Sequence, residues 1–189
     1  QSLMPILLPS SKMLKQRFIM SNEVTECTSL EMFKIYAAYN SVMNNRILDC
    51  CETLEGSVLL ENLGAYFGSI LGTLNHLINA DEVWLSRFTG EPHQVKALDQ
   101  IRFDSLEKVR DRRTELDKTI CAFVASLDPE KIQRTLSYES FVTPQKREEV
   151  LGKALLHFFN HQTHHRGQIT TLLFQKGRDP GLTDLISLV

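Results

Sequence analysis

Hydrophobic residues recur every three or four positions along four stretches of the chain, which is the spacing of the buried face of an amphipathic helix. We expect four long helices, over residues 29–54, 69–88, 105–127 and 144–176. Shorter helical segments are expected near residues 58–63 and 183–188. Long helices joined by short or moderate connections favour an all-α fold, and we predict a four-helix bundle.

Residues with known capping preferences mark the ends of these helices. Thr28 is followed by Glu31 at the spacing of a capping box, in which each side chain binds a free backbone amide of the first turn. Pro144 suits the first position of the fourth helix. Gly90 and Gly177 can adopt the left-handed conformation that ends a helix.

Two regions depart from the helical pattern. Residues 134–143 contain threonine, tyrosine, phenylalanine and valine in short stretches, which predicts a small hairpin between the third and fourth helices. Residues 1–19 include a short apolar stretch broken by Pro5, and Met20 precedes a polar stretch that resembles a natural start. We therefore expect an N-terminal extension over residues 1–19 and a single domain over residues 20–189.

Composition and charge narrow the classes of function. The net charge is −2, and 42% of the residues are hydrophobic. The one basic cluster, Arg110, Arg112 and Arg113, alternates with acidic residues and is expected on a solvated helix face. No apolar run approaches the roughly 20 residues of a membrane helix. We expect no nucleic-acid partner and no membrane partner.

The cysteine pattern gives no sign of a thiolate metal site. The four cysteines include no Cys-x-x-Cys pair, and Cys50 and Cys51 are adjacent, an arrangement that rarely forms a disulfide. Reduced and mostly buried thiols are typical of a cytoplasmic protein, which is the localisation we predict.

The histidine pattern carries the strongest chemical signal. His161 and His165 lie four residues apart within the fourth predicted helix, so their side chains point in the same direction and can bind one ion. Neutral imidazole is the commonest protein ligand for zinc and related ions. A buried pair of imidazoles without an ion or a carboxylate would leave polar atoms unsatisfied. We therefore expect a divalent metal at this pair.

A zinc-like site with one position open for a small molecule needs a third protein ligand. His76 is the one histidine in a predicted helix outside the fourth helix, so it is the candidate. His157 lies one turn before His161 and stays open as an alternative ligand, a neighbour of the ligands or a core residue.

Two familiar classes of metalloenzyme are excluded by the residues beside these histidines. A His-Glu-x-x-His protease needs a glutamate next to its first ligand, whereas this chain has Gln162. Carboxylate di-iron bundles need a glutamate three residues before a histidine, and no histidine here has one. Three neutral imidazoles leave a divalent ion its full charge, which favours binding and deprotonating water or a thiol.

Several segments of the chain share one further pattern: Leu74–Leu77, Ala80-Asp81, Trp84–Gly90, Asn160–Ile169 and, more weakly, Tyr39-Asn40 and Asn44. Together they resemble the DinB family of helical, metal-binding proteins. The resemblance extends over about residues 28–189 and is most specific in the stretch that follows His157.

The resemblance implies a four-helix bundle, often a homodimer, with a divalent metal held by His76, His161 and His165. It implies zinc or nickel as the ion. Related branches include transferases and isomerases that use a low-molecular-weight thiol. No motif in this chain assigns it to one of those branches.

We accordingly expect a metal-dependent enzyme that transfers a low-molecular-weight thiol to an electrophile. The alternatives are a metal-dependent hydrolase and a non-catalytic metal-binding stress protein. The catalytic residues stay unknown at this point. Candidates for contacts around the ligands or with a small-molecule substrate are Asn40, Asn44, His157 and Gln168.

Overall fold

The protein is described here by a computed structural model that covers residues 27–141, 143 and 145–187. The expected extension over residues 1–19, Pro144 and the last residue of the predicted closing helix lie outside the described residues. The described chain is mostly helical with one small sheet. Its four long helices are α1 (Ser29–Glu52), α3 (Ile70–Thr89), α4 (Leu106–Ala125) and α5 (Leu151–Gln175).

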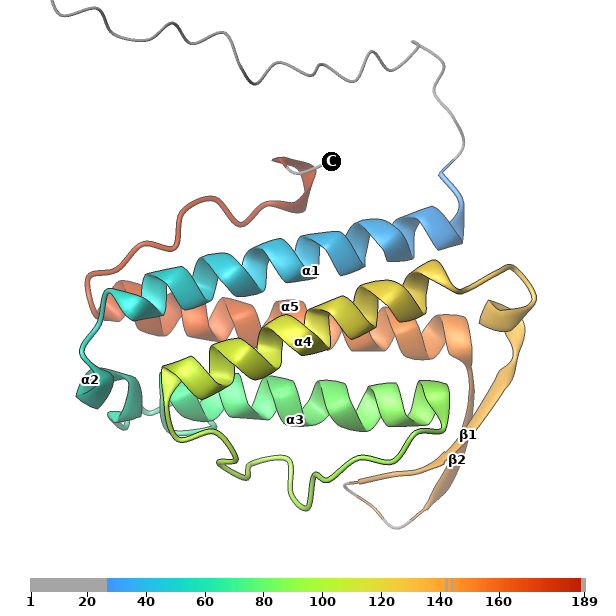
Figure 1. Ribbon diagram of the computed structural model, residues 1–189, viewed down its shortest axis with the longest axis horizontal. Coiled ribbons are helices and arrows are strands. Elements are labelled where there is room, and N and C mark those ends of the chain that lie inside the picture. The colour runs from blue at the N-terminus through green and yellow to red at the C-terminus, as the bar shows by residue number, and fades with distance from the viewer. Residues whose placement is uncertain (1–26, 142, 144, 188–189) are drawn as a thin grey trace, which may run out of the picture.

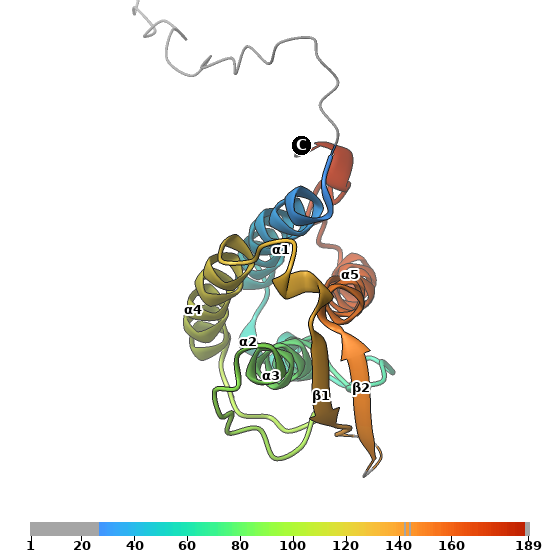
Figure 2. The ribbon, with the colours of Figure 1, turned by 90° about the vertical axis from the view of Figure 1, so that its right-hand side faces the viewer.

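The four long helices pack side by side in a ring. Helix α1 contacts α4 and α5, and α3 contacts the same two helices from the other side. Figure 2 shows this arrangement end-on, with α1 and α3 on opposite corners. Helices α3 and α4 run in one direction, whereas α1 and α5 run in the other (Figure 1). The inner face of each helix therefore points toward the other three.

Capping residues are found at three helix ends, and the two of these caps that were predicted above, the Thr28–Glu31 box and Gly90, are confirmed. Thr28 and Glu31 form both hydrogen bonds of a capping box at the start of α1. The Ser69 hydroxyl accepts a hydrogen bond from the Gly72 backbone amide at the start of α3. Gly90 ends α3 with a φ of 82°, a conformation that glycine adopts without a steric penalty.

The start of the fourth long helix was predicted wrongly. Strands β1 (Thr135–Glu139) and β2 (Lys146–Val150) pair in an antiparallel hairpin, and α5 begins only at Leu151. The hairpin between the third and fourth helices is thus present, but it extends past residue 143. The prediction of an all-α chain is too narrow for the same reason, because pairing with β1 holds Lys146–Val150 as a strand.

Short elements complete the described chain. Helix α2 (Gly56–Leu60) connects α1 to the loop before α3. The 3₁₀ turn η1 (Lys131–Gln133) precedes the hairpin, and a second 3₁₀ turn, η2 (Leu185–Ser187), lies near the C-terminus. The C-terminal segment runs back along α1, where the Tyr39 hydroxyl donates a hydrogen bond to the Thr183 carbonyl at 2.7 Å.

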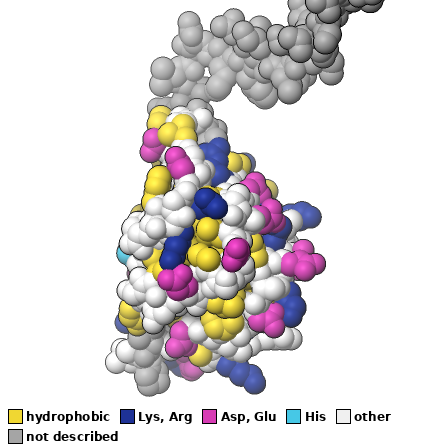
Figure 3. Space-filling model, turned by 90° about the vertical axis from the view of Figure 1, so that its left-hand side faces the viewer, with side chains coloured by type: hydrophobic (Ala, Val, Ile, Leu, Met, Phe, Trp, Pro, Cys, Tyr) yellow, Lys and Arg dark blue, Asp and Glu magenta, His cyan; other side chains and the backbone are white. Residues whose placement is uncertain are grey.

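The core between the helices is aliphatic and aromatic. Fully buried side chains come from every long helix and include Met43, Ile47, Phe88, Ile120, Phe158 and Phe159. On the face drawn in Figure 3, acidic and basic side chains are intermingled, with hydrophobic side chains between them. Among the described residues, no helix is both long enough and apolar enough to span a membrane.

A buried ionic network crosses the centre of this core. Asp81 on α3 is fully buried, and one of its carboxylate oxygens lies 2.5 Å from the guanidinium of Arg113 on α4. Arg113 also pairs with Asp117 at 2.9 Å. The expected solvated face for the arginine cluster is therefore wrong for Arg113, because its side chain points inward to two buried carboxylates.

Candidate metal centre

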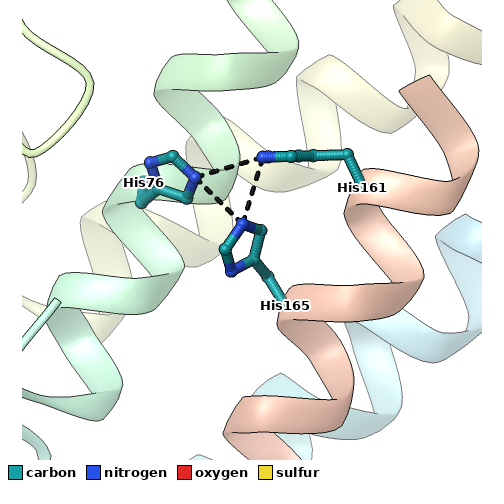
Figure 4. Close-up of side chains that lie close together, drawn as sticks. All are labelled: His76, His161 and His165. Atoms are coloured by element: carbon teal, nitrogen blue, oxygen red, sulfur yellow. Dashed lines mark hydrogen bonds between the residues drawn. The ribbon is translucent and has the colours of Figure 1, made fainter. Parts of the chain in front are cut away.

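Three histidine side chains from two helices converge near one end of the groove between α3 and α5. His76 lies in the second turn of α3, and His161 and His165 lie one turn apart on α5. Figure 4 shows the three rings turned toward one another. The four-residue spacing aligns the α5 pair, and the packing of α3 against α5 brings His76 to it.

The three Nε2 atoms form a nearly equilateral triangle. Nε2 of His76 lies 3.3 Å from Nε2 of His161 and 3.2 Å from Nε2 of His165. The two α5 nitrogens are 3.1 Å apart. An ion bound tetrahedrally at about 2.0–2.1 Å from each nitrogen would separate the nitrogens by roughly 3.3 Å. The triangle therefore has a size that suits one small divalent ion.

Hydrogen bonds on the other ring nitrogens fix the direction of two lone pairs. Nδ1 of His76 donates to the Leu98 carbonyl at 3.1 Å. Nδ1 of His165 donates to Oε1 of Gln168 at 2.7 Å. A neutral imidazole carries one proton, so Nε2 of both rings presents a lone pair to the centre of the triangle. No hydrogen bond can then join these two nitrogens, and a shared cation would satisfy both lone pairs.

Burial keeps these imidazoles neutral. Desolvation lowers the pKa of His76 to about 4, although its hydrogen bond to the Leu98 carbonyl opposes the shift, and lowers the pKa of His161 to about 3. Burial also lowers the pKa of His165, while its contact with Gln168 opposes the shift. At neutral pH all three rings are therefore in the neutral form, which binds metal ions through its free ring nitrogen.

Phe67 covers one side of the triangle. Its ring stacks on the ring of His76 with the centroids 3.8 Å apart, and its edge meets His165. The backbone carbonyl of Phe67 lies against the α carbon of Gly72, where a side chain would collide with it. Because Gly72 has no side chain, the loop before α3 can approach the helix closely enough to place the Phe67 ring against His76.

The connection between α3 and α4 covers another side. Asn75 accepts hydrogen bonds from the backbone amides of Arg102 and Phe103, both at 2.9 Å. Asn79 donates to the Gln100 carbonyl at 2.8 Å. These bonds hold the connection along α3, and they place the Leu98 carbonyl beside His76. The sequence signal was Asn75 and Asn79, four residues apart on one face of α3, and this role was not predicted from the sequence.

His157 lies outside the triangle. Its exposed ring packs against Trp84 with the centroids 5.1 Å apart and lies 6.0 Å from the ring of His161. It does not belong to the group of nitrogens that could hold an ion. Gln168, in contrast, bridges the histidines of α5, because its amide contacts His165 and, at 3.2 Å, His164.

Asn40 and Asn44 point to the buried ionic network. Both amides donate to Asp117, at 3.4 and 3.0 Å, and Asn40 accepts a hydrogen bond from Arg166. Arg166 is buried, and its guanidinium joins α5 to this network. These two asparagines therefore interact with the charged core of the protein, and among the described residues neither forms a hydrogen bond with the three histidines.

Replacing Gln168 by alanine is expected to weaken zinc binding about 10- to 100-fold, because it removes the partner that orients the ring of His165. Competition with a chromogenic chelator would measure the affinity. Gln175→Ala, an exposed change near the end of the same helix, is the matched control and should leave the affinity unchanged. Equal affinities for the two variants would argue against the orienting role of Gln168.

Comparisons with known proteins agree on one family. The family model of the DinB family matches residues 20–188. Protein DinB of Bacillus subtilis (strain 168) is 26% identical over 160 residues, which cover 80% of this chain and 90% of that protein. The crystal structure of a DinB-like protein from Bacillus cereus ATCC 10987 has a similar fold, with a TM-score of 0.59 at 20% identity over 82% of this chain and 94% of that chain. The chain belongs to the DinB family.

Proposed function

We propose that this protein is a four-helix-bundle metalloprotein that holds a divalent ion, zinc or nickel, through His76, His161 and His165. The convergence of lone pairs on one point is the observation that carries the proposal. Nε2 of His76 and Nε2 of His165 are 3.2 Å apart, and neither has a proton to share when Nδ1 of each ring donates elsewhere. Two lone pairs at this separation repel each other unless a cation lies between them.

The ligand set determines what chemistry the site can support. An ion held by the three neutral imidazoles of His76, His161 and His165 would keep its full charge and would lower the pKa of a thiol or water that it bound. The side chains around the triangle orient the ligands and limit the access of water. Phe67 covers His76, while Leu98 and Gln168 fix the rotation of two rings.

We propose thiol transfer as the reaction. The sulfur of a low-molecular-weight thiol forms a bond to an electrophilic carbon, the leaving group departs with its electron pair, and the thiol proton passes to solvent. The chain contributes the three histidines, and it binds both reactants in the pocket beside His161. Metal-dependent hydrolysis is the alternative that uses the same site.

Metal content tests the first part of this proposal. Protein purified without a histidine tag should bind zinc or nickel at one ion per chain. An ion at 100 times its dissociation constant should stabilise the native state by about 2.7 kcal/mol. Protein that neither retains metal nor gains thermal stability on adding it would contradict the metal centre.

An assay with N-acetylcysteine and chlorodinitrobenzene tests the second part. Metal-loaded protein should accelerate formation of the thioether and release of chloride, and metal-free protein should not. Release of dinitrophenol would indicate hydrolysis. Tight metal binding with no turnover of any thiol and electrophile pair would indicate a non-catalytic metal-binding protein. Light scattering would test the expected homodimer.

A further inference from the structure

A pocket of about 530 Å³ opens beside His161 and extends away from the triangle along the groove between α3 and α5. On α3 its wall is formed by Ala80, Trp84 and Arg87, which follow His76 at helical spacing along the same face. On α5 the wall is formed by His157 and Lys153, which precede His161 in the same way. The hairpin β1–β2 forms the far wall. The lining therefore extends from His161 at one end, along α3 and α5, to the hairpin at the other end.

The far end of the pocket carries excess positive charge, although the chain as a whole has a net charge of −2. Its charged lining consists of Arg87, Arg147, Lys153 and Glu149. Glu149 lies 3.4 Å from Lys153, so these two charges compensate each other. Within the described part of the chain, neither Arg87 nor Arg147 has an acidic partner. The two guanidinium groups would attract a negatively charged ligand.

Arg87 is held in place by its neighbours. Its guanidinium lies 4.5 Å from the centroid of the Trp84 ring and 4.4 Å from that of the Tyr138 ring. One of its nitrogens donates a hydrogen bond to the Glu139 carbonyl at 3.1 Å. The other guanidinium nitrogens form no hydrogen bond with described residues. A fixed guanidinium with free donors is well suited to bind a carboxylate with two hydrogen bonds.

Aromatic rings line the pocket between the arginines and the histidines. Trp84 packs against Tyr138 with the ring centroids 5.4 Å apart and against His157 at 5.1 Å. Trp84 is half-buried, so part of its ring faces the pocket. Apolar or aromatic groups of a ligand would gain contact area and stacking against this surface.

We propose that this pocket binds an elongated organic carboxylate with an apolar or aromatic body. The carboxylate pairs with Arg87, assisted by Arg147, and the body lies on Trp84. The opposite end of the ligand then lies beside His161, next to the triangle; a contact with a bound ion there rests on the proposed metal centre. The carboxylate end does not depend on the metal, because Arg87 and its partners are held by the hairpin and α3.

The single tryptophan of the chain makes the proposal directly testable. Metal-free protein would be titrated with phenylpropanoate, phenylpentanoate and phenylheptanoate while the fluorescence of Trp84 is followed. The corresponding amides have the same shape without the charge and serve as the ligand control. At least one acid should bind about tenfold or more tightly than its amide, because a charge-assisted hydrogen bond is replaced by a neutral one.

Variants assign this preference to Arg87. Arg87→Met should reduce binding of the acid to the level of the amide, and Arg87→Lys should retain part of the preference. Arg178→Met, beyond the opposite end of α5, is the matched control and should bind both ligands as the unmodified protein does. If Arg87→Met fails to fold, as judged by circular dichroism, Arg147→Met on the exposed strand should still weaken binding of the acid selectively.

The results of these binding experiments distinguish failure of the carboxylate site from failure of the metal centre. Equal binding of acids and amides, or a preference for the acid that survives in Arg87→Met, would overturn the carboxylate site. His165→Ala, whose ring belongs to the triangle and does not line this pocket, should lose zinc, measured by equilibrium dialysis, and should still bind the acid. If the unmodified protein did not bind zinc, the metal centre would be refuted, and the carboxylate site would be unaffected.

Discussion

Replacement of His165 by alanine should reduce zinc affinity by more than about 100-fold, because it removes one of three imidazoles and leaves two donors for the ion. His161→Ala should have an effect of the same size. His76→Ala should weaken binding severely while leaving the α5 pair able to retain the ion loosely. Isothermal titration of the metal-free protein with zinc would measure the three affinities.

Two other histidines provide the controls for this experiment. His93→Ala removes a histidine from the connection after α3, where its ring contacts Phe141, and should leave zinc affinity unchanged. His157→Ala removes the neighbour of His161 and should change the affinity little, since that ring lies outside the triangle. If His157→Ala abolished zinc binding while His165→Ala did not, the proposed ligand set would be wrong.

Asp81→Ala should destabilise the protein by about 3–5 kcal/mol, which is the usual cost of removing one partner from a buried ion pair. Asp81 is fully buried, and its loss leaves Arg113 with Asp117 as its one acidic partner in the described core. Because small domains are stable by about 5–15 kcal/mol in total, this loss is a large fraction of the whole. Urea unfolding followed by circular dichroism would measure it.

A surface ion pair is the matched control for this prediction. Asp104 pairs with Lys108 at 2.8 Å, and both side chains are exposed. Asp104→Ala should therefore leave the urea midpoint essentially unchanged, because exposed pairs contribute little to stability. Similar midpoints for the two variants would mean that the buried network does not hold the four helices together. Zinc affinity should also be measured for Asp81→Ala, since Asp81 and His76 share helix α3.

Local signals in the sequence determined several of the helix ends. The Thr28 and Glu31 capping box, and Gly90 at the end of α3, depend on residues within one or two turns of each other. The alignment of His161 with His165 is equally local, because the pitch of the helix sets it. Such features follow from neighbouring residues, so a pattern along the chain is enough to predict them.

The start of α5 shows where local information is insufficient. The run Lys146–Glu149 consists of good helix formers, and the sequence predicted a helix there. Pairing with Thr135–Glu139 holds this run in a strand instead. Hydrogen bonds to a partner strand outweigh propensity differences of a few tenths of a kcal/mol per residue.

Tertiary structure alone decided the remaining features of the site and the core. The sequence left His157 open, and the packing of α3 against α5 places its ring beside Trp84, outside the triangle that His76 completes. It also turns Arg113 inward to Asp81, although its neighbours along the helix indicated a solvated face. The sequence by itself determined which residues lie on one face of each helix. Which faces meet depends on how four helices pack, and that is set by contacts between residues far apart in the chain.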